Sequence, residues 1–202
     1  MSDPLQKFEG RSPPTLTLLN SPPVQLGLYP RFRYMGSKHR LLEWLHSNLQ
    51  QIPFRTAIDA FSGSGAVSYM LKSMEKEVHS IDSLHFPSVL SKALVENNAT
   101  RLSESDVERL LNARAEDDTE RFVQETFKGI FYTPEDLVFI DDLWAGIRRM
   151  SSPNKKALAL SALLRSCIKR QPRGVFTVSG QSDSYQDGRR DLQLSIREHF
   201  LE

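Results

Sequence analysis

The stretch Asp-Ala-Phe-Ser-Gly-Ser-Gly at residues 59–65 places the strongest constraint on the fold of this chain. It continues a short apolar run that begins at Thr56 and reads as a buried strand, and a helical pattern follows at 64–74. Two glycines one residue apart let the backbone turn sharply and let a ligand approach without a Cβ in the way. A strand, a glycine loop and a helix in this order indicate a parallel α/β sheet whose ligand site lies beyond the carboxyl end of the strand.

The flanking segments extend the same pattern. Leucines at helical spacing predict a helix over 38–52, and a second strand is expected at 77–82, where it ends on Asp82. A further helix is expected after Pro87. The order helix, strand, helix, strand, helix over 31–100 therefore predicts the α/β fold class.

The segments before and after the α/β part differ from it in composition. Residues 1–30 are rich in proline, which predicts an irregular or extended arm, with a disordered tail as the alternative. Residues 101–202 form a mainly helical region, in which the patterns predict helices over 103–127, 134–150, 154–171 and 187–202 and a short strand at 174–178. We therefore divide the chain into a proline-rich arm (1–30), an α/β part (31–100) and a mainly helical region (101–202).

The composition says more about the cellular compartment of the protein than about its function. The 202 residues carry 26 basic and 25 acidic side chains, a balance that neither indicates nor excludes nucleic acid. The single cysteine, Cys167, excludes an internal disulfide, and its apolar surroundings favour a buried structural thiol over a nucleophile. No stretch approaches the ~18 apolar residues of a membrane span, and no secretory signal pattern opens the chain. We expect a cytoplasmic protein and predict no metal site.

Two acids indicate what the glycine loop holds. Asp59 would face any phosphate placed in the loop, which is unfavourable for a pyrophosphate but useful for a cationic ligand. Asp82 ends the second strand, where an acid can accept hydrogen bonds from both hydroxyls of a ribose. S-adenosylmethionine satisfies both acids; the alternative is that Asp59 caps the loop and Asp82 caps the next helix. Ser68 stands where a dinucleotide motif has its third glycine, which counts against a dinucleotide-dependent oxidoreductase.

Two motifs in sequence resemble a known family, the alpha-class N6-adenine DNA methyltransferases of the Dam-like group. The first motif is an aromatic, a glycine pair, a lysine and two leucines, matched by Tyr34, Gly36, Ser37, Lys38, Leu41 and Leu42. The second is the acid-x-Phe-x-Gly-x-Gly loop, matched by Asp59, Phe61, Gly63 and Gly65, followed by the strand-ending Asp82 and a later basic element with Gly174, Phe176 and Val178. The resemblance spans about 31–200 in matching order. It implies an incomplete Rossmann-like S-adenosylmethionine-dependent methyltransferase sheet with a helical target-recognition insert.

The resemblance also implies roles for individual residues. Tyr34 would pack against the cofactor, Lys38 would reach its methionine carboxylate, and Asp82 would bind the ribose. The whole predicted cofactor set is Tyr34, Gly36, Lys38, Asp59, Phe61, Gly63, Gly65 and Asp82. The family carries target recognition in the segment at roughly 100–180 of this chain. The candidate DNA-contacting residues are Arg170, Arg173, Arg189 and Arg190, with plain surface charge as the alternative for each.

One part of the family's machinery is not found in this sequence. The family's catalytic loop reads Asp-Pro-Pro-Tyr or a close variant, and it holds a target base that is flipped out of the duplex. The Pro-Pro pairs of this chain lie at 13–14 and 22–23, before the first motif. We therefore predict no catalytic residue in this chain, double-stranded DNA as a partner, and a second polypeptide that carries the missing loop. A shortened chain, an inactive remnant and a non-catalytic DNA-binding subunit are the alternatives.

Overall fold

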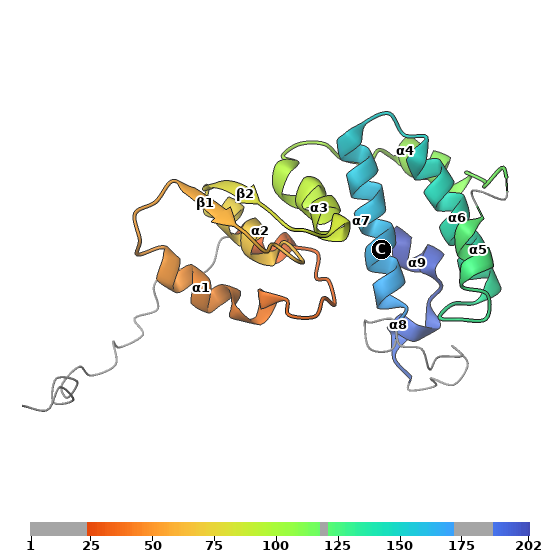
Figure 1. Ribbon diagram of the computed structural model, residues 1–202, viewed down its shortest axis with the longest axis horizontal. Helices are drawn as coiled ribbons and strands as arrows, with labels where there is room; N and C mark the ends of the chain where they lie inside the picture. The colour runs from red at the N-terminus through yellow and green to blue at the C-terminus, as the bar shows by residue number, and fades with distance from the viewer. Residues whose placement is uncertain (1–23, 118–120, 172–187) are drawn as a thin grey trace, which may run out of the picture.

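The computed structural model describes residues 24–117, 121–171 and 188–202, and its elements form two lobes (Figure 1). The N-terminal lobe runs from residue 24 to about residue 100 and holds the strands. The helical lobe contains the described residues from about 101 onward. The strand expected at 174–178 and most of the proline-rich arm lie outside the described residues. No helix in the described part of the chain is long and apolar enough to cross a membrane.

The N-terminal lobe has the predicted alternation of helices and strands. Its elements are the 3-10 helices η1 (Val24–Leu28) and η2 (Lys38–Leu41), α1 (Leu42–Leu49), β1 (Thr56–Asp59), α2 (Ala66–Ser73), β2 (Glu77–Ser80), α3 (His85–Ser91) and the π-helix η3 (Lys92–Glu96). The two strands pair in parallel, with Thr56 opposite Glu77 and Asp59 opposite Ser80. Both predicted strands and the mixed α/β class are thus confirmed. Among the described residues the sheet has these two strands.

One face of this sheet is packed and the other is open. Ala57 and Val78 contact a core that includes the fully buried Met70 and Leu90 of α2 and α3. Ile58, which points to the opposite face, is 68% exposed. The alternation of a strand's side chains accounts for this difference, because successive residues point to opposite faces.

The core of the N-terminal lobe also takes in the end of the predicted arm. Tyr29 and Phe32 are both buried members of this core. The described residues of the segment before 31 therefore belong to the packed lobe rather than to a loose arm.

The helical lobe consists of α4 (Glu104–Leu111), α5 (Phe122–Thr126), α6 (Pro134–Arg148), α7 (Pro153–Lys169), α8 (Arg190–Gln193) and α9 (Ile196–Leu201). The long helix expected over 103–127 is wrong, since α4 and α5 are separate. Carboxylates of α6 hold the backbone where that helix would have continued. Asp142 accepts from the N–H of Ala115 at 2.8 Å, and Asp141 accepts from the N–H of Val123 at 2.9 Å.

Side-chain caps fix where the long helices begin. Ser103 and Asp106 form a reciprocal capping box at the start of α4. Thr133 caps α6 and Ser152 caps α7, each followed directly by a proline in the first turn. These starts agree with the sequence because a cap and a first-turn proline are local signals.

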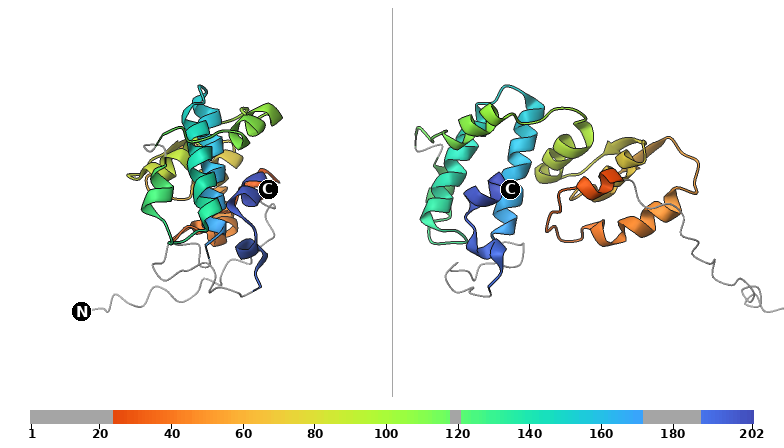
Figure 2. Two further views of the ribbon diagram at one scale, coloured as in Figure 1. Left: turned by 90° about the vertical axis from the view of Figure 1, so that its right-hand side faces the viewer. Right: turned by 180° about the vertical axis from the view of Figure 1, so that it is seen from behind.

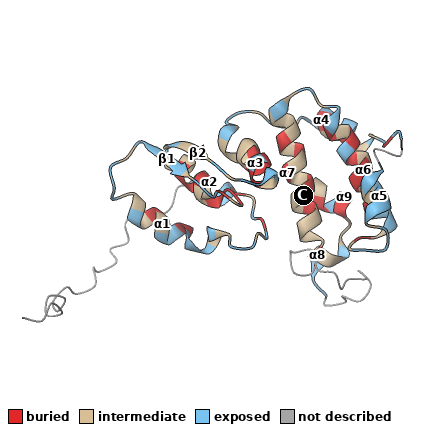
Figure 3. Cartoon of the chain, in the orientation of Figure 1, coloured by how far each residue is buried: buried red, intermediate tan, exposed pale blue. Residues whose placement is uncertain are grey.

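Helix α7 joins the two lobes. Its Ala159 and Leu163 lie in the core of the helical lobe, while Ile168 packs against the core of the N-terminal lobe. Seen from behind, α7 stands at the border between the lobes beside α3 (Figure 2). Buried residues are concentrated on α6 and α7, whereas the strands carry none (Figure 3).

Candidate functional site

The glycine loop opens a pocket at the carboxyl end of β1. This glycine-loop pocket has a volume of about 480 Å³. Its lining comes from the first motif, the loop and the end of β2: Tyr34, Gly36, Ser37, Lys38, Leu41, Leu45, Asp59, Phe61, Ser62, Gly63, Ser64, Ala66, Val67 and Asp82. Every predicted cofactor residue except Gly65 therefore lines one pocket. Gly65 stands just behind it as the N-cap residue of α2.

The two glycines of the loop have conformations that other residues rarely adopt. Gly63 has a φ of 49° and Gly65 a φ of 76°, both in the left-handed region. A Cβ on Gly63 would also lie 3.1 Å from the Tyr34 ring. That ring is held from another side by Phe86, with parallel planes and centroids 5.8 Å apart. Glycine at 63 thus lets the aromatic of the first motif lie directly against the loop.

Asp59 is fixed by two serines that sequence reasoning did not single out for this role. Its Oδ2 accepts a hydrogen bond from the Ser68 hydroxyl at 2.7 Å, and the Ser80 hydroxyl donates to Ser68 at 2.5 Å. The other oxygen of Asp59 accepts no hydrogen bond from the described residues. The carboxylate is thus oriented by its neighbours and keeps one oxygen for a ligand.

Asp82 connects the two sides of the pocket. One carboxylate oxygen accepts from the Gly63 N–H at 2.9 Å, and the other accepts from the Leu84 N–H at 3.0 Å. These backbone donors, Leu84 first, lower the pKa of Asp82, so the group is ionised at neutral pH. Each oxygen keeps a second lone pair for a further donor. Asp82 therefore orders the loop and the entry to α3, and it can still accept from ligand hydroxyls.

Residues outside the predicted set hold the loop from the N-terminal side. The Tyr29 hydroxyl donates to the Ser64 carbonyl at 2.7 Å, and the Ser37 and Ser64 hydroxyls lie 3.0 Å apart. Burial raises the pKa of Tyr29 to about 12, so the hydroxyl stays a donor. Lys38 is exposed at the pocket rim, where its ammonium donates to the Gly36 carbonyl at 3.1 Å. No signal in the sequence pairs Tyr29 with Ser64.

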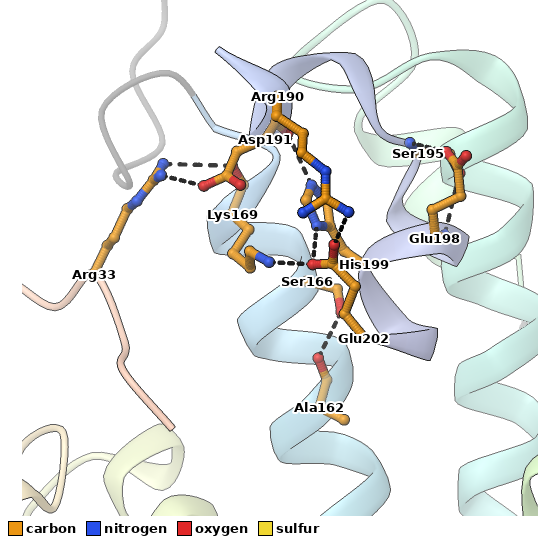
Figure 4. Close-up of polar contacts among 10 residues, drawn as sticks. All are labelled: Arg33, Ala162, Ser166, Lys169, Arg190, Asp191, Ser195, Glu198, His199 and Glu202. Atoms are coloured by element: carbon orange, nitrogen blue, oxygen red, sulfur yellow. Dashed lines mark hydrogen bonds and ion pairs between the residues drawn. The ribbon is translucent and has the colours of Figure 1, made fainter. Parts of the chain in front are cut away.

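The candidate DNA-contacting arginines are in different situations. Arg170 pairs with Asp136 at 3.3 Å, and its side chain is only 14% exposed. Asp136 also accepts from the N–H of Ile196, so this arginine ties α7 to the starts of α6 and α9. Arg190 is exposed and pairs with Glu202 at 2.7 Å (Figure 4). Arg189 is exposed beside it, and Arg173 lies outside the described residues.

Among the described residues, neither the cysteine nor the potential metal ligands form a second candidate site. Burial raises the pKa of Cys167 to about 12, which keeps the thiol protonated and fits a structural role. Within the described ranges no three His, Cys, Asp or Glu side chains are grouped so as to hold a metal ion.

A mixed α/β fold with a small parallel sheet is compatible with a methyltransferase. Residues 34–173 match the family described as D12 class N6 adenine-specific DNA methyltransferase, and the chain belongs to this family. It is also similar to the Type II methyltransferase M2.HphI of Haemophilus parahaemolyticus, with 28% identity over 151 residues. That match covers 75% of this chain and 44% of the relative, so the chain spans less than half of the relative's length. No solved structure matches the chain.

Proposed function

We propose that this chain binds S-adenosylmethionine in the glycine-loop pocket and is the cofactor-binding and DNA-recognition part of a DNA adenine-N6 methyltransferase. The parallel strands would then belong to a Rossmann-like sheet. Methyltransferases of this family generally use this cofactor. The observation that carries the proposal is that Tyr34 and Lys38 of the first motif and Asp82, which follows β2, line one pocket with the glycine loop.

The chemistry of the pocket suits the parts of the cofactor. The free oxygen of Asp59 and the face of Tyr34 both favour a positive centre, which the sulfonium and the ammonium of the cofactor supply. Lys38 offers a point charge to the methionine carboxylate. Asp82, held ionised by backbone donors, accepts from the ribose hydroxyls.

Duplex DNA is the proposed methyl acceptor, and a second polypeptide is the proposed source of the Asp-Pro-Pro-aromatic loop. The open face of the sheet supports the second proposal. Ile58 is 68% exposed there, and Ile81, which directly follows Asp59's ladder partner Ser80, is also exposed. An uncovered apolar face next to an unpaired strand edge favours association with further strands. The second candidate, a non-catalytic DNA-binding subunit, is favoured by the missing catalytic loop alone.

Calorimetric titration of the purified chain with S-adenosylmethionine tests the cofactor proposal. Asp82→Ala should weaken binding by about tenfold, because it leaves the ribose hydroxyls and the Gly63 N–H without their acceptor. Glu43→Gln, an exposed acid on α1, is the matched control and should bind as the unmodified chain does. Equal affinity in Asp82→Ala and the control would remove Asp82 from the site.

Methyl transfer tests the need for a second polypeptide. The chain alone, given radiolabelled cofactor and adenine-containing duplex DNA, should incorporate no label, because nothing positions the target amino group. Label should appear when a polypeptide with the Asp-Pro-Pro-aromatic loop is added. Clear incorporation by the chain alone would show that residues within it do the chemistry.

A further inference from the structure

A second and larger pocket, of about 700 Å³, lies between residues 31–40 of the N-terminal lobe and the C-terminal half of α7. We call it the basic cleft. The charged residues of its lining are Arg31, Arg33, Arg40, Arg165, Lys169 and Asp191. One carboxylate thus faces five cations on a chain whose net charge is only +1. The imbalance is local, which a count over the whole sequence does not reveal.

Two of these cations hold the structure together. Arg33 forms an ion pair with Asp191 (Figure 4). It also donates to the carbonyl of Gln171 at 3.3 Å. Lys169 forms an ion pair with Glu202. Both interactions fix the end of α7 against its neighbours, so these charges are already balanced within the protein.

The other three cations have no balancing carboxylate among the residues that the structure describes. Arg31, Arg40 and Arg165 form no ion pair with any described residue, and the Nε of Arg165 is buried without a hydrogen-bond partner. A buried donor that lacks a partner is unfavourable unless a ligand supplies the acceptor. His39, which lies between Arg31 and Arg40 in the sequence, also senses this positive charge. Burial and then the charge of Arg31 lower the pKa of His39. The cleft therefore has donors and positive charge that the described residues do not neutralise.

The basic cleft and the glycine-loop pocket share a wall. Tyr34, Gly36 and Ser37 line both of them. Met35 stands at the tip of the same turn and is 81% exposed. An anionic polymer held in the basic cleft would thus run directly beside the proposed methyl donor.

We propose that the basic cleft binds the backbone phosphates of duplex DNA through Arg31, Arg40 and Arg165. This inference rests on the proposed function, because it takes the methyl acceptor to be DNA. Guanidinium groups match phosphate oxygens in geometry and charge. Such contacts place the duplex without reading its sequence. The two lobes therefore hold the DNA jointly, with Arg31 and Arg40 from one and Arg165 from the other.

The test is duplex binding by fluorescence anisotropy across a salt series. The triple variant Arg31→Gln, Arg40→Gln, Arg165→Gln removes the three unbalanced charges and keeps polar side chains of similar length. At about 0.1 M salt it should bind a labelled duplex at least tenfold more weakly, and the slope of log K against log salt should fall by about 2–3. The control triple variant is Arg55→Gln, Arg101→Gln, Arg148→Gln, whose exposed arginines line neither pocket. It loses the same net charge and should keep the slope of the unmodified chain to within about one unit.

Each remaining outcome has one meaning. If both triple variants lose affinity equally, or neither does, the basic cleft is not the DNA site. If Arg165→Gln prevents folding, the double variant of the exposed Arg31 and Arg40 still must lower the salt slope by about 2. Loss of single-stranded RNA binding with duplex binding unchanged would assign the cleft to RNA instead. Calorimetry with S-adenosylmethionine separates the two proposals, because a chain that binds duplex through the cleft but no cofactor keeps this inference and loses the proposed function.

Discussion

The two lobes complete their cores to different degrees. In the helical lobe Leu143, Ile147 and Ile196 are fully buried by helices packed from several sides. The N-terminal lobe buries Met70 and Leu90 as completely, but only on one face of its sheet, and Ile58 on the other face is 68% exposed. The helical core is therefore enclosed by helices, whereas the sheet of the N-terminal lobe presents an apolar face that a further layer would cover.

The lobes also use their acids differently. In the helical lobe Asp106 is buried among donors: Lys155 at 2.6 Å, Arg109 at 2.6 Å and the N–H of Ser103 at 2.9 Å. In the glycine-loop pocket Asp59 has one oxygen without a partner among the described residues. Acids that stabilise the fold are fully paired, and acids that line the pocket keep capacity for a ligand.

The largest expected effect is a difference in the free energy of unfolding between two variants, each with one isoleucine replaced, one in each lobe. Ile147→Ala removes a fully buried side chain from the helical core and should lower the free energy of unfolding by about 2–5 kcal/mol. Ile58→Ala removes an exposed side chain and should change it by less than about 0.5 kcal/mol. Urea unfolding followed by circular dichroism measures both. Equal losses would mean that Ile58 is covered in solution and that the sheet's open face is not open.

A pH series should distinguish the paired acid Asp106 from exposed ones. Its hydrogen bonds, from Lys155 first and then Ser103, hold the pKa of Asp106 well below its usual range. A carboxyl whose pKa is lowered by folding contributes stability above its unfolded pKa, near about 4, and loses that contribution as the pH falls below it. The urea midpoint of the unmodified chain should therefore drop between about pH 5 and pH 2.

Asp106→Asn should start less stable at neutral pH and lose less over that interval. Glu108→Gln, an exposed acid on the same helix, should follow the unmodified chain. The same acid sensitivity in Asp106→Asn and in the unmodified chain would show that other groups control it.

Much of the pocket could be predicted from the sequence because its signals are local. A strand, two glycines and a helix start define the loop within a short stretch. Asp59 ends β1, and Asp82 follows two residues after the end of β2. The contacts that hold the loop could not be predicted, since Tyr29 reaches Ser64 across 35 residues and no pattern marks the pair. Arg170 shows the same limit: it stands in a basic run, but its partner Asp136 comes from another helix.

Contacts with another helix also explain why α4 and α5 are separate. The charges over 103–127 have helical spacing, and local propensity favours one helix. Asp142 of α6 instead accepts from the Ala115 N–H after α4, and Asp141 accepts from the Val123 N–H in the first turn of α5. Propensity is a weak prior, and hydrogen bonds from another element override it here.

An intermediate effect is expected from the two loop glycines. Gly63→Ala and Gly65→Ala both place a Cβ on a left-handed residue, which should cost about 1–2 kcal/mol of stability in each. The new Cβ at 63 lies 3.1 Å from the Tyr34 ring, whereas the one at 65 meets open space. Gly63→Ala should therefore weaken cofactor binding by about tenfold more than Gly65→Ala, about 1.4 kcal/mol. Equal cofactor affinities in the two variants would show that the position of the Tyr34 ring does not matter.

The smallest effect on stability is expected for two exposed phenylalanines, one in each lobe. Phe61 is 88% exposed and lines the glycine-loop pocket, and Phe122 is 63% exposed at the start of α5. Replacing either with alanine should change the free energy of unfolding by less than about 0.5 kcal/mol, because neither lies in a core. Only Phe61→Ala should change cofactor affinity, by several-fold, since an aromatic kept exposed at a pocket rim gains its burial when the ligand arrives. Thermal unfolding and calorimetric titration of both variants test this prediction. If Phe61→Ala binds the cofactor as tightly as Phe122→Ala, then Phe61 belongs to the open apolar face of the sheet. Its exposure is then explained by a protein partner rather than by the cofactor.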